Sequence, residues 1–442
     1  MRALARAVIV LATTAGIPLL TRLVRLLTRA PRVNAETAAG ITSLVTRPRG
    51  PARAATVFLN GGTALGCDHP AVRRLTRGLA RAGYLVVAPE LPGLRDGELT
   101  PATLAAVVDV ARATADRPEA RDGRVALFGV SAGASLALLA AADDDLQRRV
   151  SVVVSIAPYA DLDGIVRLAT TGFYGASPRA TAPLVREVLA RSLAACGGAE
   201  QAAELLANGD PARYDELHAC LPPETRAALA QLSPLRVAGR VDAPLELAAA
   251  PDDCYFPLAE AETLAEAAPH GRLTVTSMLD HVRLRPSLAD LPDALRFWRF
   301  TARALAAAAS PRRRVAATAQ PLRFLAVGAG GYGVTLLGFA ALYAAGAPYA
   351  AASAGAYLVA NALMYLGNRY FTFRLGHEGF WRTYRRYLAA GLAVAAANVA
   401  LLAALVQGAG LDPRAAQALS LLLLTPAAFV LFKRWTFRLR PV

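Results

Sequence analysis

The chain has 442 residues, and its 48 Lys and Arg against 33 Asp and Glu give a formal net charge of +15. Hydrophobic residues make up 55% of the chain and charged residues only 18%, a balance that soluble domains seldom show, so we expect two or three domains and a membrane part. The excess arginines flank apolar stretches and form no basic patch interleaved with aromatic side chains. This distribution argues against nucleic-acid binding and favours contact with membrane lipids.

The four cysteines are scattered along the chain without the spacing of metal ligands. We expect them to be reduced and buried, as in a cytoplasmic protein. The residues concerned are Cys67, Cys196, Cys220 and Cys254. The sequence therefore predicts neither a metal site nor a cofactor.

Residues 1–30 contain an apolar run from Ala7 to Leu20 with arginines on both sides. A cleaved signal peptide also starts with basic residues, but the arginines close behind the run and the lack of an Ala-x-Ala cleavage site argue against one. The run is short for a clean transmembrane span. We expect a tilted membrane anchor or an interfacial helix, and both alternatives stay open.

Between residues 55 and 160, short apolar runs alternate with stretches of helical periodicity. Continuous apolar runs predict strands that are buried on both faces. These runs are 55–60, 84–90, 124–129 and 150–158, and the pattern resumes at 243–251 and 272–278. The stretches 69–83 and 100–115 predict helices; Thr100 is a good N-cap for the second, and Pro101 suits its first position.

Strands that alternate with helices predict a mostly parallel sheet with right-handed crossovers. The segment between Ala160 and Val241 interrupts this pattern and is irregular and mostly helical. An insertion of this kind commonly forms a lid over the mouth of an active site. We therefore expect a lid over residues 160–240.

Ser131 lies at the centre of a Gly-x-Ser-x-Gly pattern in the stretch LFGVSAGASL. An apolar strand candidate precedes it and a strong helix former follows it. A sharp strand–turn–helix connection exposes a serine as a nucleophile, and Gly129 and Gly133 let the strand and the helix approach closely. A serine that merely capped a core helix would not require glycine on both sides.

A serine hydroxyl near pH 7 needs a base, and the base needs a residue that orients it. Of the five histidines, only His281 follows the last strand candidate, while Asp252 and Asp253 follow the strand candidate before it. The order serine, acid, histidine is that of α/β-hydrolases. Residues 40–305 therefore resemble the α/β-hydrolase superfamily, and within it the dienelactone-hydrolase-like enzymes and the acyl-ester hydrolases with a lid.

The resemblance implies roles for particular residues. Ser131 would be the nucleophile and His281 the general base, and the run 253–257 (DCYFP) is similar to the family's D-x-x-V-P turn, which favours Asp253 over Asp252 as the acid. A developing oxyanion needs two backbone donors. We expect the N–H of Ala132 and one N–H from the loop FLNGGTALG, where the family's loop carries His at the position of Asn60. The candidates in this loop are Gly62 and Thr63.

From about residue 321 the chain becomes an apolar array, joined to the preceding region by the linker 304–321. Four stretches each approach the ~20 residues that a bilayer core requires. They are 324–345, 349–366, 388–406 and 415–432. The sequence thus predicts an all-α bundle of four spans over residues 320–442.

The array consists of two similar hairpin units, 323–375 and 386–439, which close on the boxes NRYFTFR and FKRWTFR. This pattern resembles the GtrA-like family of small membrane proteins. Members are linked to cell-surface polysaccharide synthesis and are proposed to translocate polyprenyl-phosphate-linked sugars. Four arginines in the boxes could hold a lipid phosphate, although an ordinary basic interface explains them equally well. They are Arg369, Arg374, Arg434 and Arg438.

Arginines gather at both ends of the array and in its central loop, which places these parts and the preceding domain in the cytoplasm. We therefore expect a multi-pass protein of the cell membrane with a cytoplasm-facing serine hydrolase for a small acyl ester or thioester. The alternative is a transporter or flippase for polyprenyl-phosphate-linked sugars with an accessory hydrolase domain. A catalytically silent hydrolase fold that serves in binding is a third hypothesis, which the complete Ser–Asp–His pattern counts against.

Overall fold

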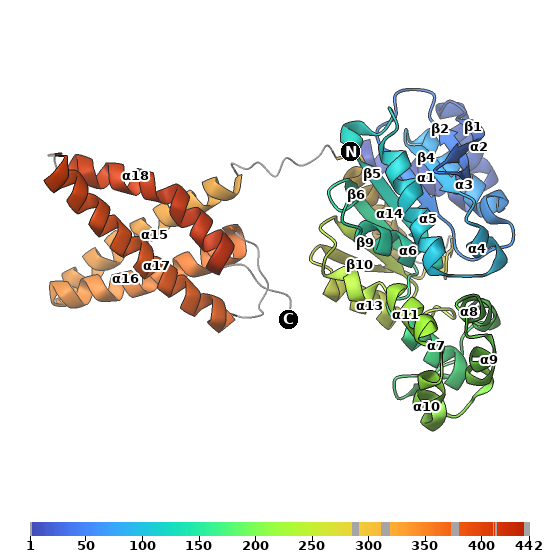
Figure 1. The fold of residues 1–442 in the computed structure, drawn as a ribbon. Coiled ribbons are helices and arrows are strands. Elements are labelled where there is room, and N and C mark those ends of the chain that lie inside the picture. The colour runs from blue at the N-terminus through green and yellow to red at the C-terminus, as the bar shows by residue number, and fades with distance from the viewer. Residues whose placement is uncertain are drawn as a thin grey trace. The chain divides into compact units, whose positions relative to one another are not determined.

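The computed structural model describes residues 2–284, 291–310, 319–372, 380–409, 411 and 413–436. It divides the chain into two compact units, Met1–Arg312 and Arg313–Val442 (Figure 1). We call them the N-terminal unit and the C-terminal unit and describe each by itself.

An eight-stranded sheet with the order β1-β2-β4-β3-β5-β6-β9-β10 forms the centre of the N-terminal unit. The hairpin β1–β2 is antiparallel, and β2 joins β4 antiparallel; from β4 to β10 all pairs are parallel. The bounds are β1 (Arg32–Ala38), β2 (Ile41–Arg47), β3 (Ala55–Leu59), β4 (Leu85–Pro89), β5 (Val125–Val130), β6 (Val150–Ile156), β9 (Leu245–Ala249) and β10 (Gly271–Val275). This mostly parallel sheet is α/β-hydrolase-like, as the sequence predicts.

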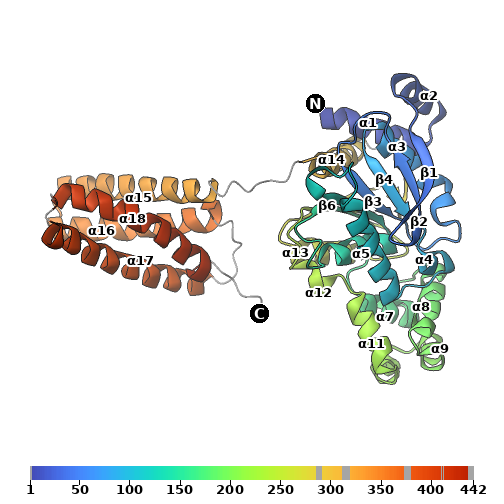
Figure 2. The same ribbon diagram turned by 45° about the horizontal axis from the view of Figure 1, so that its top comes forward.

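Two helical layers cover the sheet, so its central strands are buried on both faces (Figure 2). Alternate side chains of β3 enter opposite cores, Val57 and Leu59 on one side and Phe58 on the other. Helices α5 (Pro101–Ala115), α6 (Ala132–Ala141) and α13 (Leu258–Ala267) line the first core, and α1 (Arg2–Ala15), α3 (Pro70–Arg81) and α14 (Leu291–Ala308) line the second. Burial on both faces is why these strands read as continuous apolar runs.

All six strands predicted from apolar runs are present, with bounds that differ from the expected ones by at most three residues. Thr100 caps α5, since its hydroxyl accepts a hydrogen bond from the Thr103 N–H at 3.3 Å, and Pro101 begins the helix. The hairpin β1–β2 was not predicted from the sequence. Its outer strand, β1, is mostly exposed and carries Asn34 and Glu36, so it lacks the apolar signal of the central strands.

The segment 160–240 carries a group of helices and a two-stranded ribbon outside the sheet (Figure 1). We call the helices α7–α11 the cap helices. They are α7 (Leu162–Thr171), α8 (Pro183–Ala195), α9 (Ala199–Ala207), α10 (Tyr214–Ala219) and α11 (Pro223–Gln231), with β7 (Phe173–Tyr174) paired to β8 (Ser177–Pro178), and α12 (Leu235–Ala238) leads back to the sheet.

The N-terminal apolar run is divided into two helices, α1 and α2 (Pro18–Leu27), by a turn at Gly16, whose φ is +70°. Helix α1 packs on α3 and α14, and Ala7 and Val10 are buried in the core of the unit. A span through a bilayer would have to expose these side chains to lipid. This packing disfavours a tilted membrane anchor over residues 1–30. An interfacial helix remains possible for α2 alone.

The C-terminal unit contains four long helices, α15 (Ala319–Ala344), α16 (Tyr349–Leu366), α17 (Phe380–Ala403) and α18 (Pro413–Leu431). Short π-helical segments follow three of them: Gly367–Thr372, Ala404–Gly408 and Phe432–Thr436. Among the described residues, one helix is long and apolar enough to cross a membrane, with its span at Arg323–Leu342.

The cysteines are free, but their burial differs from the expectation. Cys67 is buried, Cys196 is half-buried, and Cys220 and Cys254 are exposed. The prediction of four buried cysteines is therefore wrong for the last two: Cys220 lies at the exposed end of α10 and Cys254 in the turn that follows β9.

Candidate active site

Ser131 occupies the tight turn between β5 and α6, with φ 54° and ψ −130°. Few residues other than glycine adopt a positive φ, and such strain persists only where the surroundings impose it. The Ser131 N–H donates to the Ile156 carbonyl at 2.9 Å, which fixes the turn to the neighbouring strand β6.

Two glycines make this turn sterically feasible. A Cβ on Gly129 would lie 2.1 Å from the carbonyl oxygen of Gly133, and a Cβ on Gly133 would lie 2.4 Å from the carbonyl oxygens of Leu59 and Asn60. These contacts are with backbone atoms, which cannot rotate away. The Gly-x-Ser-x-Gly pattern is therefore needed for the close approach of β5, α6 and β3.

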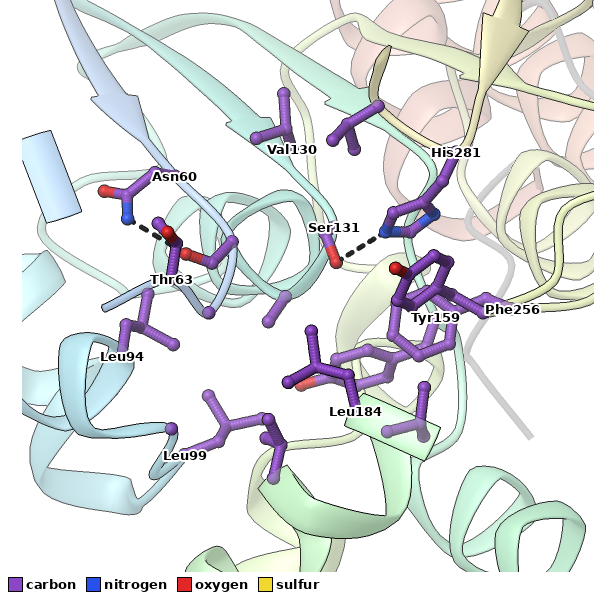
Figure 3. Close-up of a pocket in the computed structure, with 18 of the residues that line it drawn as sticks. Asn60, Thr63, Leu94, Leu99, Val130, Ser131, Tyr159, Leu184, Phe256 and His281 are labelled. Carbon is purple, nitrogen blue, oxygen red and sulfur yellow. Dashed lines mark hydrogen bonds between the residues drawn. The ribbon is translucent and has the colours of Figure 1, made fainter. Parts of the chain in front are cut away.

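His281 brings both of its ring nitrogens to predicted partners. Its Nε2 lies 2.9 Å from the Oγ of Ser131 (Figure 3), and its Nδ1 lies 2.8 Å from the Oδ2 of Asp253. The residue is 7% exposed and has φ 52°. The structure thus connects serine, histidine and aspartate by hydrogen bonds across 150 residues of chain.

Asp253, and not Asp252, faces the histidine. Its carboxylate is held on its other oxygen, since Oδ1 accepts hydrogen bonds from the N–H of Tyr255 at 2.8 Å and of Phe256 at 3.2 Å. Asp253 is 3% exposed, whereas Asp252 is exposed. The turn that follows β9 therefore orients this carboxylate through its own backbone.

Aromatic rings hold the imidazole of His281 in place. Tyr255 stacks on it with ring centroids 4.1 Å apart, and Phe256 meets it edge-on at 5.7 Å. Burial, together with the nearby Cys254 and Asp253, raises the pKa of the Tyr255 hydroxyl, so the stacked ring stays uncharged near neutral pH.

The loop that carries His281 is tied to α14 by Asp293. This carboxylate accepts hydrogen bonds from the hydroxyl of Thr276 at 3.1 Å, from the hydroxyl of Ser277 at 2.7 Å, and from the Ser277 N–H. Burial alone would raise the pKa of Asp293, but these bonds and Arg296 hold it below its usual range. In the sequence, Asp293 is only a lone acid at the start of a helix, and no prediction named it.

The loop after β3 lies close to Ser131, and a glycine in this loop makes the close contact possible. A Cβ on Gly61 would lie only 2.9 Å from the Cβ of Ser131, so this glycine, which the sequence did not single out, allows the loop to approach the serine. Asn60 is buried and donates through Nδ2 to the Gly61 carbonyl at 2.9 Å. The side chain of Asn60, which occupies the position of the histidine in α/β-hydrolases, therefore holds this loop by a local hydrogen bond.

The three predicted oxyanion donors all border one cavity. Gly62, Thr63 and Ala132 line it together with Ser131 and His281. Ala132 is the first residue of α6, where backbone N–H groups have no partner within the helix. All three residues thus lie in the wall of the cavity that contains Ser131, and their role as oxyanion donors stays a prediction.

The cavity has a volume of about 740 Å³ and extends from the serine under the cap helices. Apolar side chains from α8 and α11 form its walls there, among them Leu184, Val188, Leu189, Ala228 and Leu229. Leu94, from α4 (Pro92–Asp96), and Leu99 lie across from Leu184 (Figure 3). A cavity of this kind suits a hydrocarbon chain with its reacting group at Ser131.

Tyr159 adds one polar group to the cavity wall. It is fully buried, and its hydroxyl has no hydrogen-bond partner among the described residues. Burial raises the pKa of this hydroxyl, which therefore keeps its proton as a donor. Within the same described part of the chain, no group of three or more His, Cys, Asp or Glu could hold a metal ion.

The arginines of the C-terminal unit are only partly described. Arg369 is fully buried, and its Nη1 donates to Tyr365 at 3.2 Å and to Thr383 at 2.5 Å, so it joins the end of α16 to α17. Arg434 lies in the π-helical segment that follows α18. Arg374 and Arg438 lie outside the described residues.

Among solved structures, the chain is similar to the acylaminoacyl peptidase of Pyrococcus horikoshii. The match has 15% identity and a TM-score of 0.37 and covers 58% of this chain and 38% of that chain. A puromycin-hydrolysing peptidase of Mycobacterium tuberculosis matches with 20% identity and a TM-score of 0.40, covering 65% and 39%. A Pyrococcus furiosus esterase matches with 15% identity and a TM-score of 0.36, covering 62% and 90%. The chain thus spans well under half the length of the two peptidases.

A search of the curated proteins gives no match to this chain. Residues 323–437, in contrast, match the model of the GtrA/DPMS transmembrane domain. The chain therefore contains an N-terminal unit with an α/β-hydrolase-like fold and a C-terminal unit that matches the model of the GtrA/DPMS transmembrane domain.

Proposed function

We propose that the chain is a membrane-tethered serine hydrolase that cleaves carboxylic esters or thioesters. The observation that carries this proposal is the continuous hydrogen-bonded series Ser131–His281–Asp253 at the wall of a cavity. The strained backbone of Ser131 supports it, since strain of this kind is concentrated at functional sites.

The geometry suits acyl transfer in two steps. Ser131 Oγ attacks the acyl carbonyl while His281 Nε2 takes its proton, and Asp253 fixes the imidazole tautomer through Nδ1. The N–H of Ala132 and that of Gly62 or Thr63 stabilise the oxyanion. His281 then returns the proton to the departing alcohol or thiol, and water, activated by the same imidazole, releases the acid from the acyl-enzyme.

The apolar part of the cavity under the cap helices is proposed as the acyl site, with the segment 160–240 as a lid. Leu189, Ala228 and Leu229 offer only hydrocarbon to whatever occupies this part. A small-molecule acyl ester would place its chain here, and longer chains would bury more apolar surface.

The GtrA/DPMS match supports the proposal that the protein resides in the cell membrane as a multi-pass protein, with all four helices α15–α18 as spans. The arginines at both ends of the array favour a cytoplasmic N-terminal unit. The same match supports the second candidate function, in which the bundle, linked to cell-surface polysaccharide synthesis, moves a polyprenyl-phosphate-linked sugar and the hydrolase is accessory. In that case Arg434 and its neighbours in the second box are the candidates for a lipid phosphate.

Replacing the serine tests the assignment of the nucleophile. Ser131→Ala removes the attacking oxygen, so we expect loss of labelling by a fluorophosphonate probe and a fall in esterase turnover on the order of 10⁴–10⁶-fold. Ser177→Ala, at an exposed serine of β8, is the matched control and should label like the wild type. Full labelling of the Ser131→Ala protein in membranes would refute the assignment.

Replacing the acid tests its role in orienting the base. Asp253→Asn keeps the shape of the side chain but favours the wrong tautomer of His281, so kcat for a short ester should fall by about 10⁴-fold while the thermal midpoint changes little. The exposed neighbour gives the control, because Asp252→Asn should retain full activity. Equal activity in the two variants would show that Asp253 does not serve the histidine.

Narrowing the cavity tests the acyl site. Ala228→Phe adds a ring to the wall formed by α11, so kcat/KM for long-chain p-nitrophenyl esters should fall at least about tenfold, as expected when a pocket loses space for several methylenes. Hydrolysis of the acetate ester should stay within about twofold of wild type, because its acyl group does not reach the cap. A uniform loss across chain lengths would place the acyl chain elsewhere.

Native cysteines test the orientation. Cys220 and Cys254 are exposed, so a membrane-impermeant maleimide should label them in inside-out vesicles and not in intact cells. The buried Cys67 should stay unlabelled in both unless the protein is unfolded. Labelling of Cys220 in intact cells would put the N-terminal unit on the outer face and contradict the orientation inferred from the arginines.

A further inference from the structure

Helix α2 presents a leucine face that is exposed among the described residues of the N-terminal unit. Leu19, Leu23, Leu26 and Leu27 recur at helical spacing and are 75%, 51%, 84% and 74% exposed. Val24, on the side toward the unit, is buried. Single exposed leucines are ordinary, but a contiguous group on one short helix marks an interaction surface.

The charge around this face is uniformly positive. Arg22, Arg25 and Arg29 are exposed in or just after α2, and the first acidic residue of the chain is Glu36. An apolar face flanked by arginines on a short amphipathic helix is the pattern of helices that lie in a membrane interface. Anionic headgroups attract such arginines.

The helix is held to the N-terminal unit at both ends. Before it, Nε of Arg74 donates to the Thr14 carbonyl at 3.3 Å; after it, Nη1 of Arg81 donates to the hydroxyl of Thr28 at 2.7 Å. Helix α1, packed on α3 and α14, leads into it. The leucine face is thus a fixed surface of the unit and not a loose terminus.

We propose that the leucine face of α2 docks the N-terminal unit on the anionic surface of a lipid bilayer. The GtrA/DPMS match puts a transmembrane domain in the same chain, so a bilayer is always available to this surface at high effective concentration. Pairing of two copies through this face would bring the arginines of both helices together, which disfavours a second copy as the occupant.

Docking brings one end of the cavity toward the membrane. Thr14 and Ala15, just before α2, line the cavity together with the exposed Arg74, whereas the cap helices lie on the other side of the unit (Figure 2). An ester that enters beside α2 reaches Ser131 and can extend its acyl chain under the cap. Resting on the proposed function, this assigns the substrate class: an acyl ester or thioester that resides in the membrane.

Spin labels on the full chain in proteoliposomes test the docking. Labels at Leu23→Cys and Leu26→Cys, in a background where Cys196, Cys220 and Cys254 are serine, should be reached by oxygen and shielded from a water-soluble nickel chelate when the vesicles contain phosphatidylglycerol. Asp215→Cys, exposed on the cap helix α10, should be open to the chelate. Equal access of the chelate to positions 26 and 215 would overturn the proposal, and so would dipolar coupling between labels at position 26, which indicates a second copy.

Hydrolysis in the same proteoliposomes tests the substrate class. Leu26→Gln combined with Leu27→Gln should lower hydrolysis of a long-chain thioester dissolved in the bilayer by about tenfold or more, because less apolar area enters the interface, and leave soluble p-nitrophenyl acetate unaffected. Leu235→Gln, at an exposed leucine of α12, is the control. Equal effects on both substrates would overturn the inference. A wild-type protein that cleaves neither substrate would refute the proposed function and the substrate class, while the spin-label result would still decide the docking.

Discussion

The close packing of β5, α6 and β3 around Gly129 and Gly133 is the constraint on which the proposed site depends. With no Cβ at either position, the backbone carbonyls of Leu59, Asn60 and Gly133 can lie where side chains would otherwise stand. Ser131 is forced into a left-handed conformation at the tip of the turn, and its hydroxyl faces the cavity instead of joining the helix.

The remaining parts of the site reach this fixed point from separate strands. Asp253 follows β9 and is oriented by its own turn, and His281 follows β10 and is clamped between Tyr255 and Phe256. Because β9 and β10 are parallel neighbours, their carboxyl ends bring acid and base to the same edge of the sheet. Asp293 of α14 then holds the loop that carries His281, so the proposed base would need little reorganisation during a reaction.

Much of this arrangement could be predicted because it leaves local signals. Buried parallel strands are continuous apolar runs, the turn needs its glycines, and the chain order fixed which histidine could meet Ser131. The hairpin β1–β2 left no such signal, because an exposed edge strand alternates polar residues. Gly61 was missed since its role arises from its close approach to Ser131, far along the chain. Asp293 was missed since no local pattern marks it as the partner of Thr276 and Ser277. The apolar run at 7–20 suggested a membrane anchor, but the apolar side chains of α1 pack in the protein core instead.

Each unit of the chain supports one half of the proposal, the N-terminal unit the hydrolysis and the C-terminal unit the location in a membrane. A hydrolase-like unit with an apolar cavity is joined to a GtrA/DPMS transmembrane domain, and Arg369 shows that an arginine of that domain can serve helix packing instead of a ligand. Helix α2 of the N-terminal unit, with its exposed leucines and flanking arginines, suits a location at a membrane surface. The proposed hydrolysis and the proposed docking agree on one class of substrate, an acyl ester or thioester that resides in the membrane.

The most direct test of the central claim is to trap the acyl-enzyme. The purified full chain is mixed with excess of a slowly deacylated p-nitrophenyl ester, quenched in acid and digested, and the peptides are mapped by mass spectrometry. Our account predicts a burst of about one p-nitrophenolate per chain and one acyl group on the peptide that contains Ser131. Turnover without a burst and without an adduct on that serine, or an acyl group on another residue, would contradict it.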